Sequence, residues 1–185
     1  YGDALSGIVG LRTRGQATNS TASLGAGLAA FSADVGVPVT PTLTVRAAGN
    51  RFDLQPVLDV NGATRAFSPA PHGRDASGSV AWNYANGAEL KVFAIDQNTQ
   101  LGIGMDDPAF SGTYAHAIQG QHAVANWRHV IGAFSPQLAV PRSRHVRDEA
   151  YGAFQLSSDL VERQFFGQVD WQAAGDLVVR AGGEF

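Results

Sequence analysis

The chain has 185 residues with a formal net charge of −3, and it contains no cysteine. The length suits a single domain. The charge gives no electrostatic basis for nucleic-acid binding, and without cysteine neither a disulfide framework nor a thiolate metal site can form. Charged residues make up only 16% of the sequence, against about 25% in ordinary soluble domains. No run of 18 apolar residues is present, which excludes a transmembrane helix.

The dominant pattern is alternation of apolar and polar residues, which predicts strands through most of the chain. The one weak helical candidate, residues 22–30, contains Gly25 and Gly27, which argue against a helix. Four hairpins are expected. Their strands and turns are residues 31–37 and 43–49 around a turn at 38–41, 79–84 and 89–96 around 85–88, 122–131 and the residues after a turn at 134–137, and 165–172 and 177–185 around 173–176.

Long polar stretches lie between these tight turns. They cover approximately Asp53–Asp75, Asn98–Gln119 and Pro141–Ser158, and we expect them to be loops. Soluble sandwiches mix connection lengths without such order. Short turns at one rim and long loops at the other are typical of transmembrane β-barrels. The pattern therefore favours a membrane barrel.

The three tryptophans test this expectation. Trp82, Trp127 and Trp171 each precede a tight turn by a few residues and lie on the more apolar face of their strand, and Tyr84 joins the first of them. An aromatic girdle at a membrane interface places indoles in this way. The alternative is three ordinary core tryptophans of a sandwich. The opposite faces carry the residues that would line a polar lumen: Arg46, Asn50, Arg128, Asp170, Gln172, Arg180 and Glu184.

The first fourteen residues carry a family resemblance. Tyr1-Gly2-Asp3-Ala4-Leu5-Ser6-Gly7-Ile8-Val9-Gly10-Leu11-Arg12-Thr13-Arg14 resembles the end of the plug domain of TonB-dependent outer-membrane receptors, with Gly10 where that family usually has Asn. The opening residues also include neither a Met nor a signal peptide. We therefore expect a fragment: residues 1–15 as the last plug strand and residues 16–185 as the N-terminal portion of the barrel, with about nine strands.

The expected fold class is all-β, an antiparallel meander that forms part of a transmembrane β-barrel and stays open, because the family's barrel has 22 strands. The resemblance implies location in the cell outer membrane and active uptake of a scarce, bulky nutrient such as a ferric siderophore. The implied partners are outer-membrane lipid and lipopolysaccharide, a small-molecule or chelated-metal substrate, and the TonB complex of the full-length protein, although no TonB box occurs in this chain. No substrate-binding residue can be carried over, because the family's substrate loops share no motif.

Two alternatives remain open at this stage. Phe185, with apolar residues at every second position before it, resembles the C-terminal assembly signal of outer-membrane proteins. A small complete barrel of about eight strands with a structural or adhesive role would end in this way. The second alternative is a soluble, lipocalin-like barrel that binds a small apolar ligand.

No enzymatic site is expected, because the chain has no nucleophile elbow, no His-Glu-x-x-His and no P-loop. No cofactor or metal site is expected either, since the five histidines lack ligand spacing. These are His72, His116, His122, His129 and His145. The segment Arg142-Ser143-Arg144-His145-Val146-Arg147 is basic and is interpreted either as a solvated loop offset by Asp148 and Glu149, or as a contact for lipopolysaccharide or an anionic substrate. Asp106-Asp107-Pro108 is interpreted as a turn, with a calcium contact as the weaker alternative.

Overall fold

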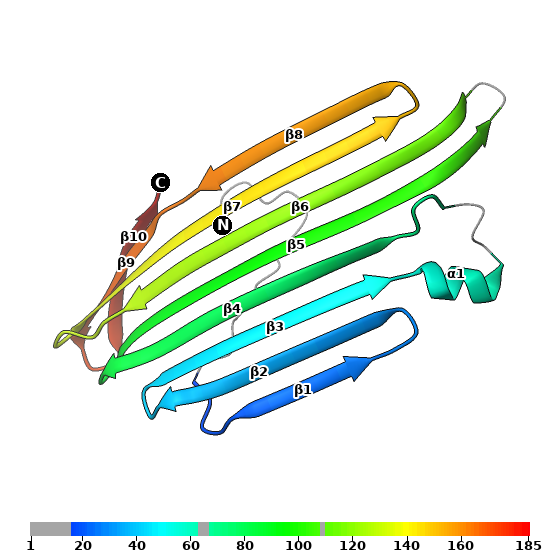
Figure 1. The fold of residues 1–185 in the computed structure, drawn as a ribbon. Helices are drawn as coiled ribbons and strands as arrows, with labels where there is room; N and C mark the ends of the chain where they lie inside the picture. The colour runs from blue at the N-terminus through cyan, green and yellow to red at the C-terminus, as the bar shows by residue number, and fades with distance from the viewer. Residues whose placement is uncertain (1–15, 63–66, 108–109) are drawn as a thin grey trace.

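The computed structural model describes residues 16–62, 67–107 and 110–185. The expected plug strand, residues 1–15, lies outside the described residues. The described chain forms one antiparallel sheet with a single short helix beside it (Figure 1). The elements are β1 (Thr21–Ala26), β2 (Ala30–Thr40), β3 (Leu43–Asp53), α1 (Gln55–Asn61), β4 (His72–Ala85), β5 (Ala88–Asp107), β6 (Phe110–Arg128), β7 (Phe134–Tyr151), β8 (Phe154–Arg163), β9 (Phe166–Ala174) and β10 (Leu177–Glu184).

The sheet is a meander in which consecutive strands pair, except that β8 and β9 both pair with β7. Strands β1 and β10 lie at opposite edges of the hydrogen-bonded path and do not pair with each other. The all-β fold and the open antiparallel meander are thus confirmed. Because hairpin connections bring consecutive segments together, this order follows from the tight turns without any long-range crossover.

Strands β8 and β9 act as one long strand along β7. Arg163 of β8 pairs with Arg142 of β7, and Phe166 of β9 pairs with Ala139, so the register does not shift between them. The interruption lies at Phe165, whose backbone exchanges two hydrogen bonds of 2.9 Å with Phe185 instead. Within the described residues the sheet has ten strands, and β8 and β9 together cover the length of β7 as one interrupted strand.

The turns at one end of the sheet are all tight, and this end is called the tight-turn end. It carries the β2–β3, β4–β5, β6–β7 and β9–β10 connections; the other end, where α1 lies, is called the far end (Figure 1). Gly87 and Gly175 have φ values of +69° and +47°. Glycine adopts this left-handed region without steric strain, as two-residue hairpin turns require. The expected turns at 85–88 and 173–176 are confirmed.

Two expected turns lie a few residues from their actual positions. The β6–β7 turn is Gly132–Ala133, closed by two hydrogen bonds between Ile131 and Phe134, rather than residues 134–137. The β2–β3 turn is at residues 41–42, while Pro38 stays in β2 next to an irregularity in the register. The proline signal was misleading because proline is tolerated at bulges and near strand ends, where a ladder N–H is not needed.

The prediction of long loops is wrong for two of the three polar stretches, which form strands. Residues 98–107 and 110–119 belong to β5 and β6, which have 20 and 19 residues, and residues 141–151 and 154–158 belong to β7 and β8. In β5 and β6 these stretches carry polar or small residues on one face, while the other face keeps apolar residues such as Leu101, Ile103 and Ile118, and their backbones pair throughout. The two ends of the sheet therefore differ in how far the strands continue beyond their apolar portion, and not in the length of the loops as expected.

The third expected loop, Asp53–Asp75, contains helix α1 and, from His72, the start of β4. Pro56 lies in the first turn of the helix, where a missing N–H does no harm. Gly62 ends it with a φ of +69°. Asp53 accepts a 2.9 Å hydrogen bond from the backbone N–H of Gln55. The helix was not expected, because a seven-residue helix gives almost no periodic signal.

The register places the three tryptophans on one face of the sheet. Trp82 pairs with Leu43 and Leu90, Trp127 with Leu90 and Leu138, and Trp171 with Phe134 and Val179. This face is called the apolar face. Paired residues of an antiparallel ladder point to the same side. The residues expected to line a lumen all lie on the opposite, polar face: Arg46, Asn50, Arg128, Asp170, Gln172, Arg180 and Glu184.

The two faces also differ in exposure. In residues 74–82 of β4 and 138–145 of β7 the apolar-face residues are exposed while their polar-face neighbours are half-buried or buried. A hollow on the polar face is lined by residues of both β5 and β10, so the sheet curls around that side. Side chains converge on a concave face and spread apart on a convex one. The tryptophans accordingly lie on the convex side, as expected from the sequence.

The sheet is a single layer without an ordinary core. The buried apolar side chains among the described residues are three alanines, Ala70, Ala81 and Ala88, and the largest fully buried side chain is that of Thr44. Large apolar side chains such as Trp82 and Val140 are instead 44% and 50% exposed. The hydrophobic surface of this chain is therefore directed outward.

Candidate functional site

An aromatic cluster lies on the apolar face at the tight-turn end. The indole N–H of Trp127 donates a 2.7 Å hydrogen bond to the hydroxyl of Tyr84, which also lies 2.8 Å from Nδ1 of His129. The ring of Trp82 is 5.2 Å from that of Tyr84. Further along the same end, Phe134 stacks on Trp171 at 6.1 Å. Each indole thus presents an apolar body, and Trp127 has its one polar hydrogen satisfied.

An apolar band extends from these aromatic residues toward the far end. On β3 to β7 and along the combined β8–β9 strand, the apolar face carries only apolar residues and glycine over several residues and then changes to a polar residue. On β2 the same face stays apolar as far as Phe31. On the strands that leave a tight turn, the first polar residue lies nine residues after it. On the strands that enter one, it lies eleven or twelve residues before it. These first polar residues are Arg51, Arg74, Asp96, Gln121, Arg142 and Arg163.

A hollow of about 880 Å³ occupies the polar face at the tight-turn end. Its polar lining includes Lys91, which pairs with Glu89 at 2.8 Å, and Arg180, which binds both carboxylate oxygens of Asp170 at 2.7 and 2.9 Å. Gln168 donates a further 3.0 Å hydrogen bond to Asp170. Paired charges of both signs on a concave wall suit a hydrated surface.

A second hollow of about 780 Å³ lies along the same face, nearer the middle of the sheet. Its apolar lining includes Phe93, Ile95 and Val124. The rings of His122 and His145 meet edge to face here, with centroids 4.7 Å apart. Apolar side chains with a few polar groups are typical of a small-molecule contact surface.

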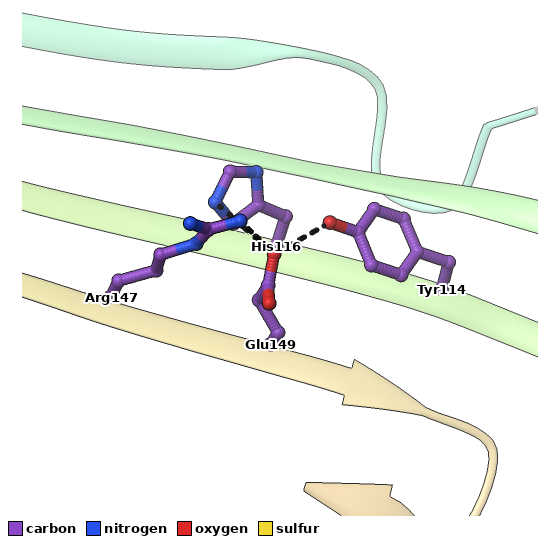
Figure 2. A network of polar contacts seen from close by, with 4 residues as sticks. All are labelled: Tyr114, His116, Arg147 and Glu149. Carbon is purple, nitrogen blue, oxygen red and sulfur yellow. Dashed lines mark hydrogen bonds and ion pairs between the residues drawn. The ribbon is translucent and has the colours of Figure 1, made fainter. Parts of the chain in front are cut away.

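A polar network occupies the polar face at the far end (Figure 2). Glu149 of β7 accepts hydrogen bonds at Oε1 from the hydroxyl of Tyr114, at 2.9 Å, and from the guanidinium of Arg147, at 2.5 Å. His116 lies opposite Glu149 in the register, and its Nε2 is 3.9 Å from the same oxygen. That distance suits an ion pair but not a hydrogen bond, so Nε2 is buried without a hydrogen-bond partner.

The network perturbs the acidity of its members. The hydrogen bond from Arg147, together with that from Tyr114, holds the pKa of Glu149 below its ordinary value of 4.5. The hydrogen bond that Tyr114 donates to Glu149 raises the pKa of Tyr114 above its ordinary value of 10.0. A carboxylate that accepts several hydrogen bonds is stabilised in its charged form. Glu149 is therefore the anionic centre of the far-end network.

The five histidines do not form one site. His72 contacts the carbonyl oxygen of Ala70 at 2.8 Å, His116 belongs to the far-end network, His122 and His145 meet in the middle, and His129 joins the aromatic cluster. Across residues 16–62, 67–107 and 110–185, no three His, Asp or Glu side chains stand close enough to hold a metal ion.

The basic segment 142–147 is not a loop, and both interpretations that placed it in one are wrong in that respect. It lies in the middle of β7, so alternation divides it between the faces. Arg144, on the apolar face, forms a bidentate pair with Asp159 at 3.0 and 2.7 Å. Arg147 reaches Glu149 on the polar face. Asp106 and Asp107 end β5, whereas Pro108 lies outside the described residues.

Sequence reasoning missed the far-end network and the common boundary of the apolar band. Tyr114 and Glu149 are 35 residues apart and lie in stretches whose polar sequence predicts loops. The boundary had a readable signal: the distance from each tight turn to the first polar residue of the apolar face. It could be measured only with the correct turn positions, two of which were misplaced.

Comparisons with protein-family models, with curated proteins and with solved structures give no match. Among the described residues, no helix has both the length and the apolar character needed to cross a membrane.

Proposed function

We propose that the chain forms part of the wall of an outer-membrane β-barrel, with its apolar face toward lipid and its polar face toward a water-filled lumen. The observation that carries the proposal is the apolar band of common height. On β3 to β7 and on the combined β8–β9 strand, the apolar face changes to polar residues at nearly the same distance from the tight turns. Packing within a protein does not require such a common boundary, whereas a planar membrane surface does.

The height of the band agrees with a membrane. Nine to twelve residues span about 30–40 Å of strand at roughly 3.3 Å each. Strands in membrane barrels tilt by about 35–45°, which reduces this to about 21–32 Å, and the apolar band of such barrels is about 25 Å tall. The aromatic cluster marks the tight-turn boundary, where an amphipathic indole suits the headgroup level.

The exposed apolar surface supports the same proposal. The apolar face carries Val92, Val140 and Val169 at 41%, 50% and 41% exposure, with no layer packed on it among the described residues. A contiguous apolar surface that extends over several neighbouring strands is rare on soluble monomers and marks contact with a membrane or a partner. The open sheet does not support a small closed barrel, which requires its first and last strands to pair.

Within this proposal, the barrel is that of a TonB-dependent receptor that takes up a scarce, bulky nutrient such as a ferric siderophore. The support is the resemblance of residues 1–14 to the end of that family's plug domain, with the meander that follows it. The two hollows on the polar face would then belong to the wall along which the substrate passes. The sequence encoded upstream of Tyr1 tests this part: a plug domain there supports it, and its absence contradicts it.

Membrane insertion is tested by cysteine accessibility, since the natural chain has no cysteine. Val140→Cys faces the apolar side and Ala139→Cys, its neighbour, the polar side. In chain refolded into phospholipid vesicles, we expect a water-soluble maleimide to label position 139 and not position 140. Gln119→Cys, on the apolar face beyond the band, is the control and should be labelled. Equal labelling of 139 and 140 would contradict the proposal.

A further inference from the structure

Two pairs of arginines stand directly opposite each other on the apolar face. Arg51 of β3 pairs with Arg74 of β4, and Arg142 of β7 pairs with Arg163 of β8. Like charges directly opposite on adjacent strands destabilise a sheet. Within the described part of the chain, no ion pair or side-chain hydrogen bond is found for these four side chains, in contrast to Arg144, which is neutralised by Asp159. An anion bound between the two guanidinium groups would relieve the repulsion within each pair.

The two pairs occupy equivalent heights. On the strands that leave a tight turn, Arg51 lies nine residues after Thr42, and Arg142 lies nine residues after Ala133. Since the strands rise by the same amount per residue, the two side chains lie at the same distance along the strand from their turns.

The strands that enter a tight turn repeat this relation. Arg74 lies twelve residues before Asn86, and Arg163 lies twelve residues before Gly175. All four arginines are thus the first polar residues beyond the apolar band, at the boundary away from the aromatic cluster. Two strands, β5 and β6, separate the pairs, and at this height they carry Asp96 and Gln121, joined by a 2.9 Å hydrogen bond.

The surface directly below the second pair is apolar. A depression of about 410 Å³ on the apolar face extends from Arg142 across β6, β5 and β4; small residues such as Ala94 and Ala123 line it, and Arg142, Arg144, Asp96 and Gln121 lie at its polar border. Val140, two residues nearer the turn than Arg142, is 50% exposed, and Phe165, beside it, is 40% exposed. A ligand that fits here has an anionic group at the level of the guanidinium and a hydrocarbon portion beneath it.

We propose that the arginine pairs Arg51/Arg74 and Arg142/Arg163 bind phosphate groups of lipid headgroups in the leaflet at the far end of the sheet. Guanidinium groups bind phosphate through two parallel N–H···O bonds, and two opposed arginines present such forks to one anion. A bound phosphate also relieves the repulsion within each pair. The inference rests on the proposed membrane function and adds the lipid chemistry that the barrel wall selects.

The experiment measures binding of the refolded chain to three kinds of vesicle by flotation. One is the uncharged, phosphate-free glycolipid digalactosyldiacylglycerol. The second contains one fifth phosphatidic acid, and the third one fifth of an anionic sulfolipid without phosphate. We expect the chain to enter all three and to bind most tightly with phosphatidic acid. An arginine near an anionic surface contributes about fivefold in affinity, so each double variant, Arg51→Gln with Arg74→Gln or Arg142→Gln with Arg163→Gln, should lose roughly twenty-fivefold of that binding.

The control removes the same charge from the polar face, in Arg46→Gln with Arg128→Gln, and should retain the preference for phosphatidic acid. Circular dichroism checks that each variant keeps its strand content. Insertion into all vesicles without a preference for phosphatidic acid, or an equal loss in the control, overturns the arginine inference alone. Failure to enter any vesicle overturns the proposed membrane function, and this inference with it.

Discussion

The two halves of the hairpin β5–β6 show the same backbone ladder in two environments. Near the tight turn, Leu90 and Trp127 point outward from an apolar surface, whereas beyond the band the paired residues Asn98 and Gln119 occupy the same face. Register and pairing do not change between them. The difference is one of surroundings, because the ladder satisfies its backbone hydrogen bonds in either medium, while side chains must match the medium they meet. The far half thus keeps the same pairing although the face that is apolar near the tight turn is polar there.

The largest effect is expected from a charge placed in the apolar half. Val169→Arg introduces a guanidinium in the middle of the band, where Val169 is 41% exposed and pairs with Pro136 and Ala181. In a bilayer, an arginine at this depth should destabilise the folded chain by about 2–4 kcal/mol. The free energy of unfolding from vesicles in a urea titration measures this.

Gln119→Arg, in the far half of the same face, is the matched substitution and should change stability by less than about 1 kcal/mol. Comparable losses from the two variants would show that the halves do not differ in their surroundings and would remove the main support for a membrane boundary.

The next effect concerns the turns that end the two halves. Gly87, at the tight-turn end, has a φ of +69°, and a Cβ there would lie 2.6 Å from Cγ2 of Val130. Gly152, at the far end, has a φ of +57° with nothing within 4 Å of such a Cβ. Both alanine variants incur the cost of a left-handed non-glycine residue, about 1 kcal/mol, but only Gly87→Ala adds a steric clash. We expect Gly87→Ala to lower the free energy of unfolding by about twice as much as Gly152→Ala, and equal values would contradict the tight packing of the β4–β5 turn.

A smaller effect is expected from the aromatic cluster. Tyr84→Phe removes the hydroxyl that accepts the 2.7 Å hydrogen bond from Trp127 and contacts His129. The loss should be about 1 kcal/mol, the usual net value of one hydrogen bond. A double-mutant cycle with Trp127→Phe measures the coupling in urea unfolding. If the two losses simply add, the hydrogen bond contributes nothing to stability.

The smallest effect is the pH dependence of the far-end network. The pKa of Glu149 is depressed in the folded chain, so the carboxylate contributes stability above the ordinary value of 4.5. That contribution is lost as the pH falls through the lower folded pKa. Arg147→Gln should raise the pKa of Glu149 toward 4.5, because it removes the first cause of the depression.

The ¹³C chemical shift of the Glu149 carboxyl group, followed by NMR against pH, measures this change directly. Arg144→Gln is the control, since its guanidinium binds Asp159 on the other face and should leave the titration of Glu149 unaltered. A titration that is the same in the natural chain and in Arg147→Gln would contradict the assignment of Glu149 as the anionic centre.

Alternation by itself determined the strands near the tight turns, the face shared by Trp82, Trp127 and Trp171, and the polar character of the opposite face. These follow from the side-chain period of two, which any extended segment obeys. The turns at Gly87 and Gly175 were also readable, because asparagine or small residues beside a glycine specify a left-handed turn.

Only the tertiary structure decided how far the strands extend and which distant residues meet. The far halves of β5, β6 and β7 lose most of the apolar residues on the face that carries the tryptophans, so the length of these strands is decided by pairing with their neighbours. The opposition of Arg142 to Arg163, and of Tyr114 to a network centred on Glu149, depends on the register between strands. Register is set by the position of each turn, and a displacement of one residue would turn every side chain to the other face.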